Sequence, residues 1–116
     1  MGRINKRMLG SEYEQRAAEY LAGQGLKILE RNYRCRQGEI DLIARDGSYL
    51  VFVEVKYRSD ESKGDPAEAV GSHKQQRIRA AARYYLYQNR YGEETPCRFD
   101  VIAILDKKIR WIRDAF

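Results

Sequence analysis

The sequence predicts an α/β fold in which helices flank a mixed β-sheet. Three patterns support this prediction: a helical apolar stripe near the start, two adjacent β-prone runs in the middle, and a second helical stripe followed by two short apolar runs. The resulting order of elements, αβββαββ, is typical of a mixed sheet covered by helices. With 116 residues and 43% hydrophobic content, the chain suits a single domain over residues 1–116.

The first helix is expected over residues 11–23, where Tyr13, Ala17 and Leu21 recur at helical spacing. Ser11 is a suitable N-cap, and Glu14, three residues later, would complete a capping box. Residues 26–35 interleave apolar and arginine side chains, which fits an extended strand.

The two central β-prone runs, GEIDLIA (38–44) and YLVFVEVKY (49–57), predict a β-hairpin. Between them, Asp46-Gly47 is a preferred two-residue turn. A turn at that position would pair residues whose numbers sum to 93, so that Glu39 faces Glu54.

A second helix is expected from about residue 67 to residue 89, with an interruption near Gly71. Its apolar stripe consists of Ile78, Ala81, Ala82, Tyr85 and Leu86. The runs FDVIAIL (99–105) and IRWI (109–112) predict two closing strands. Trp111 in the last strand suits either packing in the core or a contact in a homodimer.

The charge balance favours a polyanionic partner. The chain has 22 Lys and Arg against 17 Asp and Glu, a net charge of +5 and a pI near 9.3. Charge alone does not distinguish a polyanionic partner from an anionic surface. We expect a nucleic acid, DNA rather than RNA, and five basic residues are predicted to contact its phosphates: Arg36, Arg58, Lys74, Arg77 and Arg79. The alternative for each is an ordinary solvated surface charge.

Two further expectations come from composition. No stretch approaches the roughly 18 to 20 apolar residues that a membrane span needs, so we expect a cytoplasmic protein with no membrane partner. Four tyrosines in and after the second helix could stack on bases, although aromatic residues at helical spacing more often form core or interface: Tyr84, Tyr85, Tyr87 and Tyr91.

The predicted hairpin gathers acidic residues. Because side chains alternate along a strand, Glu39, Asp41, Glu54 and Lys56 are expected on one face. Facing acids need a compensating cation, a proton or solvent. Mg²⁺ or Mn²⁺ held by Asp41 and Glu54 would compensate them, and Lys56 could orient a water or stabilise charge on a phosphate. The alternative is a solvated strand face with ordinary ion pairs.

The motifs GEIDLIA, VFVEVKYR and FDVIAI, with EYEQRAAEYLAGQGLKILERNYR near the start, resemble the YraN-like group of uncharacterised bacterial proteins, and through it the PD-(D/E)xK nuclease superfamily. The resemblance covers nearly the whole chain and implies a restriction-endonuclease-like fold. It implies that Asp41 and Glu54 bind metal, that the Val55 carbonyl can add a ligand, and that Lys56 assists the attacking water. Related archaeal Holliday-junction resolvases use a first-helix glutamate, matched here by Glu14.

Three functions are consistent with these patterns. The first is a metal-dependent nuclease that hydrolyses phosphodiester bonds of DNA, with branched or single-stranded DNA among its candidate substrates. The second is a module that binds nucleic acid without cutting it, and the third is an interaction subunit of a DNA-processing assembly that uses the tyrosine-rich helix. The set of Asp41, Glu54 and Lys56 favours the enzyme, because a pure binder has no reason to place acids where phosphates approach.

Overall fold

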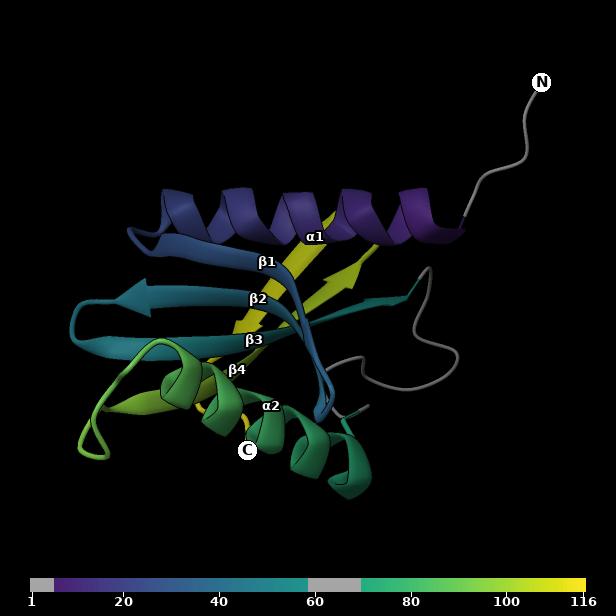
Figure 1. Ribbon diagram of the computed structural model, residues 1–116. Helices are drawn as coiled ribbons and strands as arrows, with labels where there is room; N and C mark the ends of the chain where they lie inside the picture. Colours follow the sequence, from purple (N-terminus) through teal and green to yellow (C-terminus); the bar gives the residue numbers. More distant parts are fainter. Residues whose placement is uncertain (1–5, 59–69) are drawn as a thin grey trace.

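The computed structural model describes residues 6–58 and 70–116 (Figure 1). Its elements are α1 (Lys6–Gly23), β1 (Lys27–Cys35), β2 (Gly38–Asp46), β3 (Tyr49–Arg58), α2 (Ser72–Gln88), β4 (Cys97–Leu105) and β5 (Lys108–Ile112). The strands form one sheet in the order β1-β2-β3-β4-β5, with β3 and β4 parallel and the other neighbours antiparallel. The predicted order αβββαββ and the mixed sheet are confirmed.

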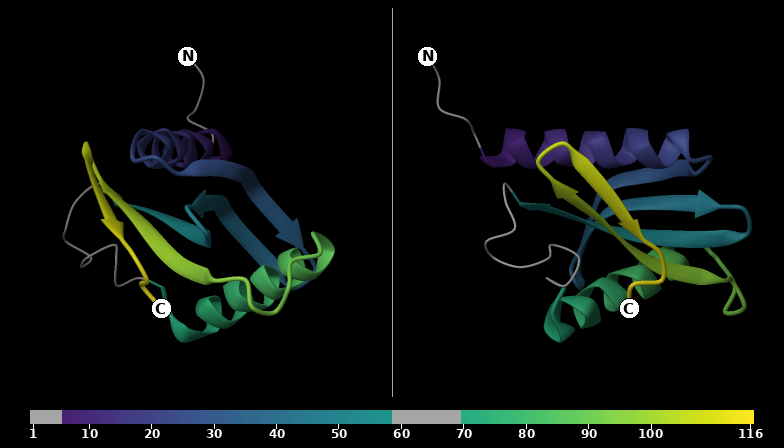
Figure 2. Two further views of the ribbon diagram at one scale, coloured as in Figure 1. Left: turned by 90° about the vertical axis from the view of Figure 1, so that its left-hand side faces the viewer. Right: turned by 180° about the vertical axis from the view of Figure 1, so that it is seen from behind.

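The sheet separates the two helices (Figure 2). On the α1 side, Ala17 and Leu21 pack in one buried cluster with sheet residues such as Val53. On the α2 side, Ile78 and Tyr85 pack in a second cluster with sheet residues that include Ile43, Leu50, Phe52 and Val101. This arrangement agrees with the restriction-endonuclease-like fold that the resemblance implies.

The first helix begins earlier than the sequence predicts. It starts at Lys6, so Ser11 lies inside the helix and cannot be its N-cap. The capping-box role of Glu14 is therefore wrong. In the second helix, the predicted apolar stripe is confirmed, and the helix begins at Ser72, directly after Gly71; residues 67–69 lie outside the described part of the chain. No helix in the described ranges is long and apolar enough to cross a membrane.

The hairpin between β2 and β3 turns one residue later than predicted. Asp46 pairs with Tyr49, so the turn residues are Gly47 and Ser48. The residue numbers of each facing pair therefore add up to 95 rather than 93. Gly47 has a φ of 61°, as a type II′ turn requires at its first central position. Asp46 stays in the strand because its carboxylate accepts a hydrogen bond from Arg98 at 2.9 Å. The predicted pairing of Glu39 with Glu54 is therefore wrong.

The strands β2 and β3 part at the end of the sheet remote from this turn. Their last paired residues are Leu42 and Val53. Before Leu42, β2 follows β1 in a bend toward α2, while β3 continues straight (Figure 1). The bend places Ile40 in the buried cluster on the α2 side, and an added Cβ at Gly38 would lie 3.1 Å from the Arg77 carbonyl oxygen of α2. The end of the β1–β2 hairpin is therefore fixed against α2.

Candidate functional site

Asp41 and Glu54 meet where β2 and β3 part. The Asp41 carboxylate accepts a hydrogen bond from the backbone N–H of Val55 at 2.8 Å, which links it to the residue next to Glu54. The Glu54 side chain is only 5% exposed. Because charged side chains are rarely buried without a compensating partner, this carboxylate needs a nearby cation.

Two lysines supply positive charge to Glu54. The Nζ of Lys74, in the first turn of α2, lies 2.6 Å from Glu54 Oε1, and the Nζ of Lys56 lies 3.8 Å from the same oxygen. Burial and the neighbouring Lys74 lower the pKa of Lys56. Burial by itself would lower the pKa of Lys74. The hydrogen bond to Glu54 outweighs this effect, so the pKa of Lys74 is raised. Of the two lysines, Lys74 therefore lies closer to Glu54 and holds its proton more tightly than Lys56 does.

Among the residues that the structure describes, none forms such an ion pair with Asp41. Burial and the negative charge of Glu54 raise the pKa of Asp41 to about 8, and the hydrogen bond from Val55 offsets only part of this rise. At neutral pH the Asp41 carboxyl is therefore mostly protonated. The pair thus carries less negative charge than two ionised carboxylates would, because one acid is held by lysines and the other by a proton.

This raised pKa predicts that stability falls as pH rises. The unfolded chain ionises Asp41 near its ordinary value of 3.8, whereas the folded chain does so at about 8. The stabilisation from the protonated Asp41 carboxyl is fully present below the unfolded pKa and is lost as pH rises through the folded pKa. Between the two pKa values, the free energy of unfolding falls by at most about 1.4 kcal/mol per pH unit. In urea unfolding between these values, Asp41→Asn should show a flatter pH dependence than wild type. Parallel profiles would contradict the assignment.

Glu14 approaches the same acids from α1. Burial raises its pKa, a hydrogen bond with Asn32 lowers it, and the charges of Glu39 and Glu54 raise it further. Glu14 in turn contributes to the raised pKa of Asp41. Asn32 has a φ of 52°, a conformation that asparagine tolerates better than most residues, at the bend of β1. The approach of Glu14 to within the distance of a metal or water shared with these acids stays a prediction.

Glu39 does not share a face with Glu54 as predicted. Its neighbour Ile40 packs on the α2 side, and successive side chains point to opposite faces of a strand. Glu39 is accordingly exposed and forms an ion pair with Arg34, whose Nε lies 3.5 Å from Glu39 Oε2. The alternation fails near Asp41 because β2 leaves β3 there and the Asp41 side chain takes the Val55 N–H.

The acids do not form a closed metal-binding cage. Within residues 6–58 and 70–116, no three carboxylate, imidazole or thiolate side chains are close enough together to hold one ion. Two carboxylates are sufficient for Mg²⁺, which commonly keeps several waters and takes only one or two protein carboxylates. The oxygen-only donors and the raised pKa of Asp41 fit a hard cation, since such an ion would replace the proton as compensating charge.

The five predicted phosphate-binding residues lie in different environments. Lys74 joins the acid pair, as described above. Arg36 and Arg77 are exposed, and Arg58 is partly buried at the end of β3. The guanidinium of Arg79 lies over two rings, at 5.6 Å from the Phe99 centroid and 5.4 Å from the Phe116 centroid. Arg79 therefore packs against the C-terminal segment, and contact with phosphates stays a prediction for all five.

Sequence reasoning assigned Lys74 to the phosphate-binding surface and did not place it at Glu54. A signal was available, because a helix that connects parallel strands begins near the carboxyl end of the first strand. Glu54 and Lys56 lie toward that end of β3, and Lys74 lies in the first turn of the following helix. Asn32 was missed as well, and its contact with Glu14 depends on a bend in β1 that periodicity does not reveal.

Comparison with known proteins identifies relatives over nearly the full chain. A profile of the uncharacterised protein family UPF0102 matches residues 13–104. A UPF0102 protein of Lachnoclostridium phytofermentans is 56% identical over 113 residues, which cover 97% of this chain and 96% of the relative. A UPF0102 protein of Janthinobacterium sp. (strain Marseille) is 49% identical, with coverage of 97% and 90%. The chain therefore belongs to the uncharacterised protein family UPF0102.

Proposed function

We propose that this protein is a metal-dependent nuclease that hydrolyses phosphodiester bonds of DNA, with branched or single-stranded DNA as its substrate class. One observation carries the proposal: the carboxylates of Asp41 and Glu54 lie on neighbouring strands at the point where these strands part, beside the amines of Lys56 and Lys74. An acid pair with adjacent cations suits the hydrolysis of a phosphodiester, whose reaction develops negative charge on phosphate oxygens.

Each residue has a distinct role in this proposal. Asp41 and Glu54 would hold Mg²⁺ or Mn²⁺, with the Val55 carbonyl as a further predicted ligand. When bound, the ion would polarise the phosphate and make water a better nucleophile. Lys56, whose pKa is lowered, is suited to orient that water or to exchange a proton with it. Glu14 is a candidate acid or base at the border of the cluster.

Metal binding should release a proton from Asp41. Because the Asp41 carboxyl is mostly protonated below pH 8, an ion that binds its ionised form must displace that proton. Calorimetric titration with Mn²⁺ at neutral pH, in two buffers of different ionisation enthalpy, should detect about one proton released per ion, with less release above pH 8. Asp41→Asn should bind Mn²⁺ more weakly and release no proton. Equal binding by wild type and Asp41→Asn would exclude Asp41 as a ligand.

A second candidate function is a nucleic-acid-binding module without catalytic activity. The observation that favours it is the contact of Lys74 with Glu54, which neutralises this acid within the chain itself. An acid pair compensated by lysine and a proton repels phosphates less than two ionised acids would. This module would bind DNA without Mn²⁺ and would not cut it with Mn²⁺, so a cleavage assay separates the two functions.

A further inference from the structure

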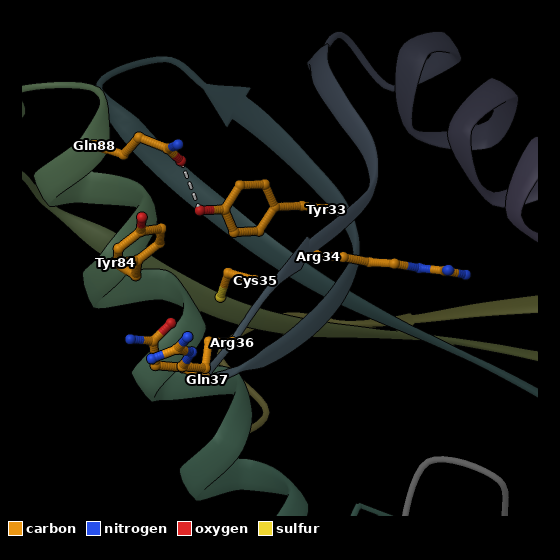
Figure 3. Close-up of a pocket in the computed structure, with 7 residues that line it drawn as sticks. All are labelled: Tyr33, Arg34, Cys35, Arg36, Gln37, Tyr84 and Gln88. Atoms are coloured by element: carbon orange, nitrogen blue, oxygen red, sulfur yellow. Dashed lines mark hydrogen bonds between the residues drawn. The ribbon is translucent and has the colours of Figure 1, made fainter.

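A second site lies between the end of β1 and α2. It is a pocket of about 480 Å³, lined by Tyr33, Arg34, Cys35, Arg36, Gln37, Tyr84 and Gln88 (Figure 3). The residues before Tyr84 come from the bent end of β1 and the turn after it, and Tyr84 and Gln88 come from successive turns of α2. The pocket therefore exists because the β1–β2 hairpin bends against this helix.

The tyrosines of this pocket offer aromatic surface in a fixed position. The Tyr33 ring packs edge-on against the buried Tyr85 ring, with centroids 5.2 Å apart, and its hydroxyl donates a hydrogen bond to Gln88 Oε1 at 2.9 Å. Tyr84 is 37% exposed and belongs to neither buried cluster. Core packing accounts for Tyr33. The ring of Tyr84 lies 6.4 Å from the exposed ring of Tyr87 and is tilted against it by 39°, so Tyr84 keeps part of its surface accessible for stacking with a planar ligand.

The polar groups of the pocket suit the edge of a nucleobase. Gln37 and Gln88 carry amides, each of which can donate and accept hydrogen bonds. Arg36 adds an exposed positive charge, and none of the described residues that line the pocket is an aspartate or glutamate. An aromatic surface, amides and a cation are the groups with which proteins bind unpaired bases and their phosphates.

Arg34 links the pocket to Glu39, the exposed acid two residues before Asp41. Its side chain points away from the tyrosines in Figure 3, and its Nε lies 3.5 Å from Glu39 Oε2. Tyr33 pairs with Ile40, the residue that precedes Asp41, and paired strands lie only about 5 Å apart. The pocket therefore begins on β1 directly beside the part of β2 that carries Asp41.

We infer that this pocket receives an unpaired base of the nucleic-acid substrate, stacked on Tyr84, so that the substrate class is nucleic acid with single-stranded or splayed bases. This inference rests on the proposed function for its connection to cleavage, although base binding itself does not require catalysis. A base that is paired in a duplex has no free ring face to present to Tyr84, which makes the pocket selective for unpaired regions.

Binding of a labelled thymidine oligonucleotide tests the inference, since this probe cannot pair with itself. Measured by fluorescence anisotropy without divalent ions, Tyr84→Ala should weaken binding about tenfold, because one base–aromatic stack is lost. Tyr84→Phe keeps the ring and should bind like wild type. Tyr49→Ala is the control, since Tyr49 is 43% exposed on β3, does not line the pocket and, unlike Tyr87, is not in ring contact with Tyr84. It should bind like wild type as well.

The thiol of Cys35 provides a readout that needs no substitution. Cys35 lines the pocket and is partly buried, and Cys97 is a second partly buried free thiol that does not line it. Saturating thymidine oligonucleotide should slow alkylation of Cys35 by iodoacetamide and leave alkylation of Cys97 unchanged. Alkylation of Cys35 at an unchanged rate, or equal loss of affinity in Tyr84→Ala and Tyr49→Ala, would overturn the inference.

Duplex DNA separates this inference from the proposed function. Tyr84→Ala should bind a fully paired duplex as wild type does, because the bases are not accessible. If DNA is cleaved but Tyr84→Ala binds the thymidine oligonucleotide normally, the base pocket is wrong and the nuclease stands. If wild type cleaves nothing but the Tyr84→Ala defect and Cys35 protection are found, the nuclease is wrong and the base pocket stands.

Discussion

Asp41→Ala and Glu54→Ala are each expected to lower DNA cleavage with Mg²⁺ or Mn²⁺ on the order of 100-fold or more, because each removes one of the two proposed metal-binding carboxylates. Affinity for DNA should stay unchanged or increase, since removing an acid also removes repulsion toward phosphates. Lys56→Ala should retain Mn²⁺ binding yet lose turnover to a similar degree, because its amine is proposed to act on water or on developing charge and not as a metal ligand. Initial rates on single-stranded, branched and linear DNA measure these effects.

The matched control is Glu19→Ala, which removes an exposed acid from α1 outside the cluster and should cleave like wild type. Circular dichroism should show every variant folded, because these polar side chains are not part of the two buried apolar clusters. Equal cleavage by wild type and Asp41→Ala would point to a contaminating nuclease. Tight binding by all forms without cleavage by any would favour the binding module.

The largest loss of stability is expected from Asp100→Ala. Asp100 is fully buried and accepts hydrogen bonds from the Arg98 guanidinium at 3.0 Å, from Trp111 Nε1 at 2.9 Å and from the Asp114 N–H at 2.9 Å. Removing one partner of a buried ion pair leaves the other charge unpaired and typically costs about 3–5 kcal/mol. Urea unfolding should show this loss in the free energy of unfolding.

Asp100→Asn should lose less stability than Asp100→Ala, because the amide keeps one accepting oxygen and most of the packing. Glu93→Ala, which changes an exposed acid, is the control and should stay within about 0.5 kcal/mol of wild type. A loss below about 1 kcal/mol in Asp100→Ala would show that Arg98 and Trp111 find other partners. This outcome depends only on the fold and is independent of catalysis.

The elements of the fold could be predicted because their signals are local. The apolar stripe of α2, from Ile78 to Tyr85, follows from helical spacing alone. The hairpin register could not be predicted in this way, because Asp46-Gly47 and Gly47-Ser48 are both acceptable turns. The choice depends on Arg98, which lies 52 residues from Asp46 in sequence.

The candidate site was partly predictable for the same reason. Glu54 and Lys56 lie two residues apart on a regular strand, so their common face follows from alternation. Glu39 was placed on the wrong face because β2 loses that alternation at Asp41, where a side chain replaces a partner strand as acceptor for the Val55 N–H. This hydrogen bond between the Asp41 side chain and the Val55 backbone depends on tertiary structure, so no periodic pattern in the sequence predicts it.

The contact between Lys74 and Glu54 gives this acid a compensating cation from within the chain, without a bound ion. Structural zinc sites hold a protein together only when the ion is present, whereas here a tethered ammonium supplies positive charge in the folded chain. Folding of this chain therefore does not require a bound metal ion. An ion from solution competes with a cation whose effective concentration is set by its covalent attachment and does not change with dilution. If the proposed metal binds here, Lys74 competes with it for Glu54, and the occupancy of the proposed site would depend on how strongly the ion, together with a phosphate, displaces this lysine.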